Sequence, residues 1–218
     1  MDRGILRLLL KMSIVKTLFF NFHYFGANGW HMPVLISRNV SLKSVGGGVI
    51  VESYKIGNVK IGFDNIGIGD GRHQRGTLQI LGSVVIGEGV NISTGVKICC
   101  GENGHLVLNK KTSININSEI ICMDNIELGE NAMVSWDVLI IDSDFHQIVE
   151  DGIRKPITAP IIIGSNVWIG CRSVVLKGST VPNGCIIAAN CTVSNSFNKK
   201  NVIIVGKRII AENVSWNR

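Results

Sequence analysis

The stretch IGSNVWIGCRSVVLKGSTVPNGCIIAANCTV, residues 163–193, has a six-residue repeat. A branched apolar residue stands at every sixth position from Ile163 to Val193, and small or slim residues recur four positions after these starts. A period of six fits neither an amphipathic helix nor a simple alternating strand. It fits a triangular coil with three flat faces per turn, in which the first residue of each hexad points inward and stacks on its equivalents.

The repeat continues in shorter series toward the N-terminus. These series are Ile86, Ile92 and Ile98; Leu108, Ile114 and Ile120; and Leu128, Val134 and Ile140. A β-sandwich of alternating strands would not keep so many hexads in phase. We therefore predict an all-β solenoid over residues 31–194, with residues 1–30 capping one end and residues 195–218 capping the other.

The largest break in the repeat is DSDFHQIVEDGIRKPITAPII, residues 142–162. A solenoid accommodates an insertion only as a loop at one of its corners, and such loops tend to carry functional residues. We therefore predict a loop insertion at about 142–160 and look for catalytic groups within residues 141–160.

Composition narrows the classes of function. Apolar residues make up 45% of the chain and charged residues 17%, and the net charge is +6. The Lys and Arg residues are scattered and form no nucleic-acid-binding motif, so we expect a solvated surface or anionic ligands and no nucleic acid. The six cysteines lack the spacing of zinc ligands, so we expect small buried thiols, no metal and a reducing, cytoplasmic location.

The N-terminal stretch RGILRLLLKMSIVKTLFFNFHYF, residues 3–25, places Arg3, Arg7, Lys11 and Lys16 between apolar residues. These charges exclude an ordinary membrane span. Two interpretations remain. The segment is either a packing helix that caps the solenoid or docks on a neighbouring subunit, or a basic amphipathic helix in peripheral contact with the inner membrane.

Several stretches resemble the hexapeptide-repeat acyltransferases, which include maltose and galactoside acetyltransferases and the sugar O-acetyltransferases of capsule and O-antigen synthesis. They are SWDVLIIDSDFHQI (135–148), PIIIGSNVWIGCRSVVLKGSTVPNGCIIAANCTV (160–193) and ENVSW (212–216); KTLFFNFHYF (16–25) resembles a surface-polysaccharide subgroup. The resemblance implies a left-handed parallel β-helix that uses acetyl-CoA as cosubstrate and a saccharide as acceptor. It also implies a homotrimer with active sites between subunits.

The resemblance makes His146 the expected catalytic base. A sugar hydroxyl is a poor nucleophile near neutral pH, and an imidazole is suited to taking its proton as it attacks the thioester. A carboxylate that accepts from one ring nitrogen would fix the tautomer of that imidazole. Asp142, Asp144 or a backbone carbonyl can serve, and the sequence does not choose among them.

Further residues are expected at the coenzyme. Backbone N–H groups at the Gly170–Cys171 turn are candidate donors to the developing oxyanion. Relatives end with a Gly-Asn-Pro-Ala-Lys-like segment, whereas this chain reads VGKRII at 205–210 and lacks the Pro-Ala. The residues expected to line the coenzyme, from the family's positions and this tail, are Trp168, Gly170, Cys171, Ala189, Ser194, Lys207 and Arg208.

Two residues are candidates for the acceptor. Trp136 is expected either to stack on a sugar ring or to pack at a corner of the coil, and Asp137 is a candidate for holding a sugar hydroxyl. A basic group, Arg72, His73 and Arg75, is a solvated loop by default, but it could meet an acidic acceptor.

Three functions remain open. The first is acetylation of a sugar hydroxyl of a surface polysaccharide or its precursor. The second keeps the chemistry but uses a small acceptor such as an amino sugar, serine or an antibiotic. The third is a non-enzymatic or metal-binding β-helix, which the scattered histidines do not favour.

Overall fold

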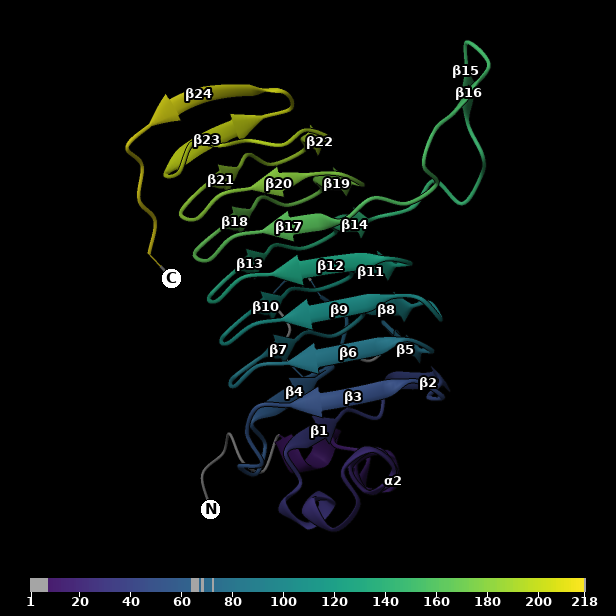
Figure 1. The fold of residues 1–218 in the computed structure, drawn as a ribbon. Coiled ribbons are helices and arrows are strands. Elements are labelled where there is room, and N and C mark those ends of the chain that lie inside the picture. Colours follow the sequence, from purple (N-terminus) through teal and green to yellow (C-terminus); the bar gives the residue numbers. More distant parts are fainter. Residues whose placement is uncertain (1–7, 64–66, 68, 72, 218) are drawn as a thin grey trace.

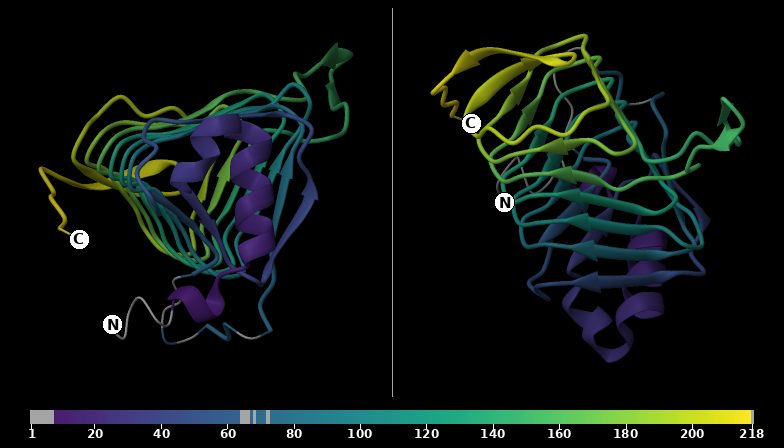
Figure 2. Two further views of the ribbon diagram at one scale, coloured as in Figure 1. Left: turned by 90° about the horizontal axis from the view of Figure 1, so that it is seen from below. Right: turned by 45° about the horizontal axis from the view of Figure 1, so that its top comes forward.

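The chain folds into an elongated three-sided coil, and the computed structural model describes residues 8–63, 67, 69–71 and 73–217. Three mainly parallel sheets form the long faces, and we number them 1 to 3 in the order in which the chain enters them. Each turn of the coil contributes one strand to sheet 1, then one to sheet 2 and one to sheet 3, before the chain rises to the next turn (Figure 1). Seen along the coil, the outline is triangular (Figure 2). The predicted all-β parallel solenoid is therefore confirmed.

The strands of these sheets are short, and all except the last one, β24, pair in parallel with the strand one turn away. Sheet 1 contains β1 (Val34–Ile36), β4 (Val59–Ile61), β7 (Asn91–Ile92), β10 (Ser113–Ile114), β13 (Met133–Val134), β18 (Trp168–Ile169), β21 (Ile186–Ile187), β23 (Val202–Val205) and β24 (Arg208–Glu212). Sheet 2 contains β2 (Val40–Ser44), β5 (Gly76–Ile80), β8 (Lys97–Cys100), β11 (Glu119–Cys122), β14 (Leu139–Ile141), β19 (Val174–Leu176) and β22 (Thr192–Val193). Sheet 3 contains β3 (Gly48–Val51), β6 (Ser83–Ile86), β9 (His105–Leu108), β12 (Asn125–Leu128), β17 (Ile161–Ile163) and β20 (Thr180–Val181).

The first residues of the hexads form the core, as their period predicts. All the branched apolar residues of the four series point inward and are buried, and the slim residues four positions later are buried beside them at the corners. Burying one such side chain contributes about 1.5–3 kcal/mol, so the stacked columns supply the main stabilising term. Cys99 and Cys171 depart from the expectation of buried thiols, because they are half-exposed while the other four cysteines are buried.

The N-terminal end of the coil is closed by helix α2 (Ile14–Phe25), which lies across it (Figure 2), and by the 3-10 helix η1 (Gly26–His31). The helix supplies polar groups to the edge strand β1. Asn21 Nδ2 donates to the Val34 carbonyl at 2.7 Å, and Asn21 Oδ1 accepts from the Val34 N–H at 3.1 Å. Thr17 Oγ1 accepts from the Ile36 N–H at 3.1 Å. The edge of sheet 1 is thus satisfied by these side chains and by the Ser13 N–H, which donates to the Ile36 carbonyl at 2.8 Å.

The C-terminal end is closed differently. The repeat continues past residue 194, because β23 adds to sheet 1 in parallel with β21 and buries Val202 and Ile204. β24 then turns back antiparallel to β23 and forms the last strand of the sheet. A hairpin therefore ends the coil.

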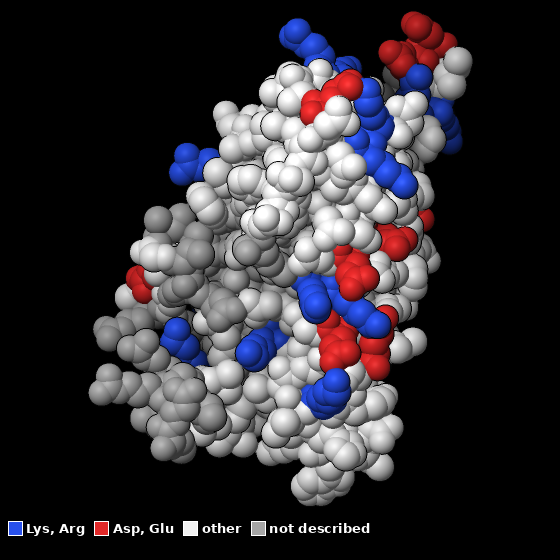
Figure 3. Space-filling model, turned by 90° about the vertical axis from the view of Figure 1, so that its left-hand side faces the viewer, with Lys and Arg blue, Asp and Glu red and all other residues white. Residues whose placement is uncertain are grey.

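Charged side chains lie on the surface. On the face in Figure 3, acidic and basic side chains lie side by side at mid-height, and much of the remaining surface is uncharged. Lys97 and Glu119 form an ion pair at 2.6 Å between the neighbouring strands β8 and β11. Arg3, Arg7 and Arg72 lie outside the described residues. No described helix is both long enough and apolar enough to cross a membrane.

Candidate active site

The loop at residues 142–160 leaves the coil at the corner where sheet 2 passes to sheet 3, which we call the loop edge. It projects outward and ends in the small hairpin of β15 (Val149–Glu150) and β16 (Ile153–Arg154) (Figures 1 and 2). At its base the two arms are tied together: the Asp144 N–H donates to the Ile157 carbonyl at 2.9 Å, and the Ala159 N–H donates to the Asp142 carbonyl at 3.0 Å. The predicted insertion and its bounds are confirmed.

Asp142 is a structural residue of this base. Its carboxylate is buried and accepts from two backbone N–H groups of the turn below, Met123 at 2.7 Å and Asp124 at 2.9 Å. Burial raises the pKa of the Asp142 carboxyl above its ordinary value, although these N–H donors oppose that shift. Both oxygens accept hydrogen bonds that hold the loop to the coil, and a role of Asp142 in orienting His146 stays a prediction.

Asp144 is paired with a lysine that the sequence analysis did not single out. Lys177, one turn above, approaches Asp144 Oδ2 to 2.5 Å, and both side chains are partly buried. The same Lys177 Nζ donates to the Pro156 carbonyl on the opposite arm of the loop. One ammonium group therefore ties both arms together. A Lys inside a hexad reads as a surface residue, so the sequence offered no signal for this role.

His146 follows directly from this anchored segment. Phe145 has a φ of 59°, in the left-handed region, and its N–H donates to Ser143 Oγ at 3.0 Å. The imidazole is exposed, and no described residue forms a hydrogen bond with it. A hollow of about 340 Å³ lies at the same loop, lined by Asp144, Ile148, Lys155, Pro156, Ala159 and Lys177. The single chain thus presents the imidazole to solvent.

Most of the other predicted residues lie at a different corner, where sheet 1 passes to sheet 2, which we call the turn edge. Its tight turns stack directly: the Arg172 N–H donates to the Trp136 carbonyl at 3.0 Å, and the Asn190 N–H donates to the Cys171 carbonyl at 2.8 Å. Asp137, Arg172 and Asn190 each have φ near 57° and repeat the same bend. Trp136, Asp137, Cys171 and Ala189 therefore form one continuous column.

Gly170 belongs to this column for a packing reason. A Cβ on Gly170 would lie 2.5 Å from the Ala189 backbone nitrogen, so only glycine allows the turns to stack so closely. The Gly170 N–H donates to the Ile187 carbonyl at 2.8 Å. It is therefore not available to an oxyanion, which corrects half of the Gly170–Cys171 expectation.

Trp168 lies on the outer side of sheet 1, as its slot in the hexad predicts. Its indole is half-buried, and Nε1 donates to Ser135 Oγ at 2.9 Å. Trp216 from the C-terminal segment packs against it, with ring centroids 6.0 Å apart, and donates to the Asn166 carbonyl. Trp216 lies in a stretch already quoted for its resemblance, yet its contact with Trp168 needs the fold.

The remaining two sets of residues separate. Lys207 and Arg208 are exposed at the β23–β24 turn. This turn lies above the turn edge, since the Ala188 N–H in the turn below donates to the Ile204 carbonyl. Ser194 follows β22 and lies instead on the loop edge. Sheet 2 separates the two edges by about five residues, or roughly 17 Å. The described residues contain no cluster of three or more metal-ligating side chains.

Comparisons with known proteins agree with this architecture. Residues 160–195 match the family of bacterial transferase hexapeptides (six repeats). An uncharacterized 24.8 kDa protein in the cps region of Klebsiella pneumoniae is 28% identical over 190 residues, covering 84% of this chain and 81% of that protein. The putative lipopolysaccharide biosynthesis O-acetyl transferase WbbJ of Escherichia coli is 24% identical over 135 residues, covering 57% of this chain and 68% of that protein.

A solved structure shares the fold. The polysialic acid O-acetyltransferase OatWY superposes with a TM-score of 0.56 at 22% identity, over 82% of this chain and 91% of that one. The left-handed parallel β-helix expected from the sequence is thereby confirmed. Over residues 160–195, where its hexads are buried as the repeat requires, the chain is similar to the bacterial transferase hexapeptide family.

Proposed function

We propose that this protein is an O-acetyltransferase that moves the acetyl group of acetyl-CoA to a sugar hydroxyl of a surface polysaccharide or its precursor. The names of similar proteins support this activity, since they include a putative lipopolysaccharide O-acetyl transferase and a galactoside O-acetyltransferase. The observation that carries the proposal is an exposed imidazole, His146, on a loop whose two arms are tied by Lys177.

The proposed site lies between two copies of the chain in a homotrimer. Within one chain, sheet 2 separates His146 from the turn edge, so neither edge alone supplies both a base and a coenzyme groove. The turn edge suits a long, thin ligand with phosphates at one end: Cys171 and Ala189 are small and accessible, and Lys207 and Arg208 are exposed cations above them. The loop edge of one copy facing the turn edge of the next would join the two halves.

In this proposal His146 moves the proton. Its unprotonated ring nitrogen takes the proton of the acceptor hydroxyl as the hydroxyl oxygen bonds to the thioester carbon. Acetyl-CoA supplies the activated acyl group. The imidazolium returns the proton to the departing thiolate as the carbon–sulfur bond breaks, so atoms and charge balance. Asp144 Oδ1, which is not used in the Lys177 pair, would accept from the other ring nitrogen, and the Cys171 N–H remains as a donor to the oxyanion.

The reaction needs acetyl-CoA and a sugar precursor, both of which are supplied in the cytoplasm, and we place the protein there, with its N-terminal end in peripheral contact with the inner membrane. That contact is supported by the basic, apolar character of the N-terminal segment.

The test is release of coenzyme A thiol from acetyl-CoA in the presence of candidate glycans. His146→Ala should lower kcat by roughly 10²–10⁴-fold and leave the unfolding midpoint unchanged, because the side chain is exposed. His105→Ala, which removes another exposed imidazole from β9, is the matched control and should keep full activity. An active His146→Ala protein would refute the role of this base. Transfer to amino sugars in preference to hydroxyl acceptors would favour the small-acceptor alternative.

A further inference from the structure

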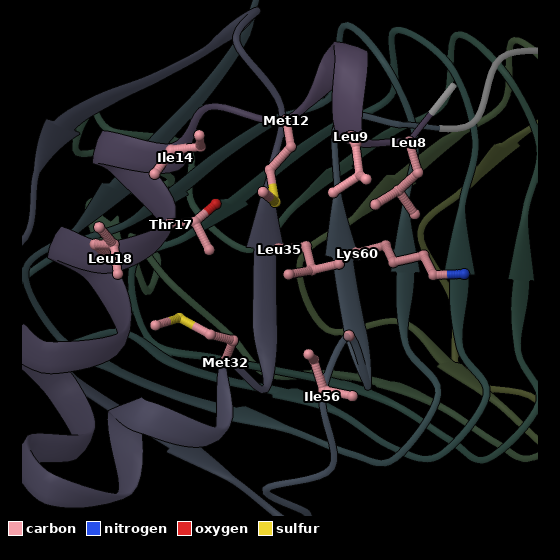
Figure 4. Close-up of a pocket in the computed structure, with 11 residues that line it drawn as sticks. Leu8, Leu9, Met12, Ile14, Thr17, Leu18, Met32, Leu35, Ile56 and Lys60 are labelled. Carbon is pink, nitrogen blue, oxygen red and sulfur yellow. The ribbon is translucent and has the colours of Figure 1, made fainter. Parts of the chain in front are cut away.

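An apolar groove lies at the N-terminal end of the coil, outside the proposed catalytic site. It has a volume of about 640 Å³ and runs between residues 8–18 on one side and the first turn of the coil on the other (Figure 4). Side chains from both sides point into it, including Leu9, Met12 and Ile14 from the N-terminal segment and Leu35 and Ile56 from the coil. Lys60 extends along one end of it.

The apolar surface continues beyond the groove. Ile56, at 79% exposed, and Ile14, at 63%, are open to solvent although both line the groove. Val15, Leu10 and Trp30 add further exposed apolar side chains on the same N-terminal region. Single exposed apolar residues need no explanation, but exposed apolar residues that line one groove, here Ile14 and Ile56, mark an interaction site.

A polar hollow lies on the other side of the segment that walls the groove. It has a volume of about 260 Å³, and Lys11, Ser37, Arg38 and Thr94 are among its lining residues. Lys11 and Arg38 also hold the segment in place, because the Arg38 N–H donates to the Lys11 carbonyl at 2.9 Å. The segment therefore has an apolar side toward the groove and a cationic side toward the hollow.

The charge of this end is positive. Residues 1–60, which include every residue that lines the groove, hold eight of the 22 Lys and Arg residues and two of the 16 Asp and Glu residues, so the rest of the chain holds 14 of each and is neutral. The whole net charge of +6 thus belongs to the N-terminal region.

We propose that this end docks on an anionic lipid bilayer, with lipid acyl chains in the groove and lipid phosphates at Lys11, Arg38 and Lys60. An apolar groove beside a cationic hollow matches the two ends of a phospholipid, and an exposed Trp is suited to the interface between them. A second copy of the same end is a poorer occupant, because it would bring the same positive charge against the first. The proposal names the surface behind the membrane contact suggested above and does not depend on acetyl transfer.

The test is flotation of the full-length protein with vesicles, without acetyl-CoA or acceptor, so that its failure leaves the proposed activity untouched. The protein should float with phosphatidylcholine vesicles that contain phosphatidylglycerol, and much less with phosphatidylcholine alone or at high salt. The double variant Ile14→Ser with Ile56→Ser should bind at least about tenfold more weakly. Lys11→Gln should also weaken binding, by about fivefold.

Matched controls exist elsewhere on the chain. Ile153→Ser with Ile210→Ser makes the same chemical change at side chains that are 64% and 61% exposed but distant from the groove, and it should bind like the wild type. Lys200→Gln is the control for Lys11. Equal binding to neutral and anionic vesicles, or full binding by the groove variant, would overturn the proposal. The proposal would also be overturned if the wild type failed to float and the groove variant sedimented as a smaller species than the wild type. In that case the groove would be a contact between copies of the chain.

Discussion

The coil and the loop at residues 142–160 differ in how far their side chains are buried and in how their backbone is paired. In the coil, each inward residue is buried and each strand has a fixed register, as in Ile126↔Ile161 across β12 and β17. In the loop, residues 145–156 are all exposed, and the two arms are joined at the base, at the β15–β16 tip and by a few hydrogen bonds between them, such as Gln147 Nε2 to the Lys155 carbonyl at 2.7 Å. Yet the loop does not disturb the coil, because the strands on either side of it keep the register of the turns below.

This contrast shows how a repeat can carry chemistry. Side chains inside the coil are fixed by stacking, so a change there is felt by neighbours above and below. Side chains on the loop contribute little to folding and are free to serve a reaction. The loop is nevertheless positioned, because Lys177 and Asp142 fasten its base to the coil.

The largest expected effect separates core from loop. Leu128→Ala should lower the free energy of unfolding by about 2–5 kcal/mol, because it leaves a cavity among fully buried side chains. Ile148→Ala, on the exposed loop, should change it by less than about 0.5 kcal/mol. Urea denaturation at matched protein concentration measures both. Similar losses in the two variants would mean that the loop is part of the core.

A pair of glycines tests the same contrast in the backbone. Gly170→Ala should cost about 1–3 kcal/mol, because its Cβ would press on the Ala189 nitrogen of the next turn. Gly152 at the loop tip has open space around it and a φ of 76°. Gly152→Ala should therefore lower the free energy of unfolding by about 1 kcal/mol, only because alanine disfavours the left-handed backbone conformation. Thermal unfolding of the two variants should therefore place Gly170→Ala lower. The reverse order would contradict the close stacking of the turn edge.

Lys177 connects the two regions, and its loss should affect activity more than stability. Lys177→Met should lower kcat by about tenfold, equivalent to about 1.4 kcal/mol, and leave the KM for acetyl-CoA unchanged. The reason is that the ammonium group no longer ties together the two arms of the loop that carries His146. The unfolding free energy should fall by no more than about 1 kcal/mol.

Two further variants separate positioning from general structure. Lys177→Arg keeps the cation and should recover part of the rate. Lys155→Met removes a lysine whose ion pair with Glu150 stays within the loop, and it should keep nearly full activity. If Lys177→Met is as active as the wild type, the tie between the loop arms has no part in catalysis.

The smallest effect concerns the Asp142 carboxyl, whose pKa burial raises in the folded chain. The folded protein holds this proton more tightly than the unfolded chain, so the stability it contributes is fully present below the ordinary pKa of 3.8 and is lost as the pH rises through the folded value. Asp142→Asn removes that dependence. The difference in unfolding free energy, wild type minus variant, should therefore decrease with rising pH above about 4, and parallel curves would contradict the raised pKa.

Much of this architecture could be predicted because a hexad is a local pattern. The six-residue spacing alone predicts that Ile163, Ile169 and Val175 point inward, and the break at residues 142–160 predicts a loop. The contacts of Asp142 and Asp144 could not be predicted, because they depend on which backbone N–H groups lie on the turn below and on Lys177 in the turn above. Lys177 and Trp216 were likewise missed as partners of Asp144 and Trp168, since each contact joins distant segments.

The sequence alone determined the six-residue repeat, its small corner residues and the single large interruption. It could do so because the burial pattern repeats every six residues and is visible from residues close together in the sequence. Only the tertiary structure decided which corner each side chain occupies. The four residues between Asp137 and Asp142, which include β14, are enough to place these two side chains on different edges, and stacking then gathers Trp136, Cys171 and Ala189 into one column. The division of the candidate site between two edges follows from that winding of the chain.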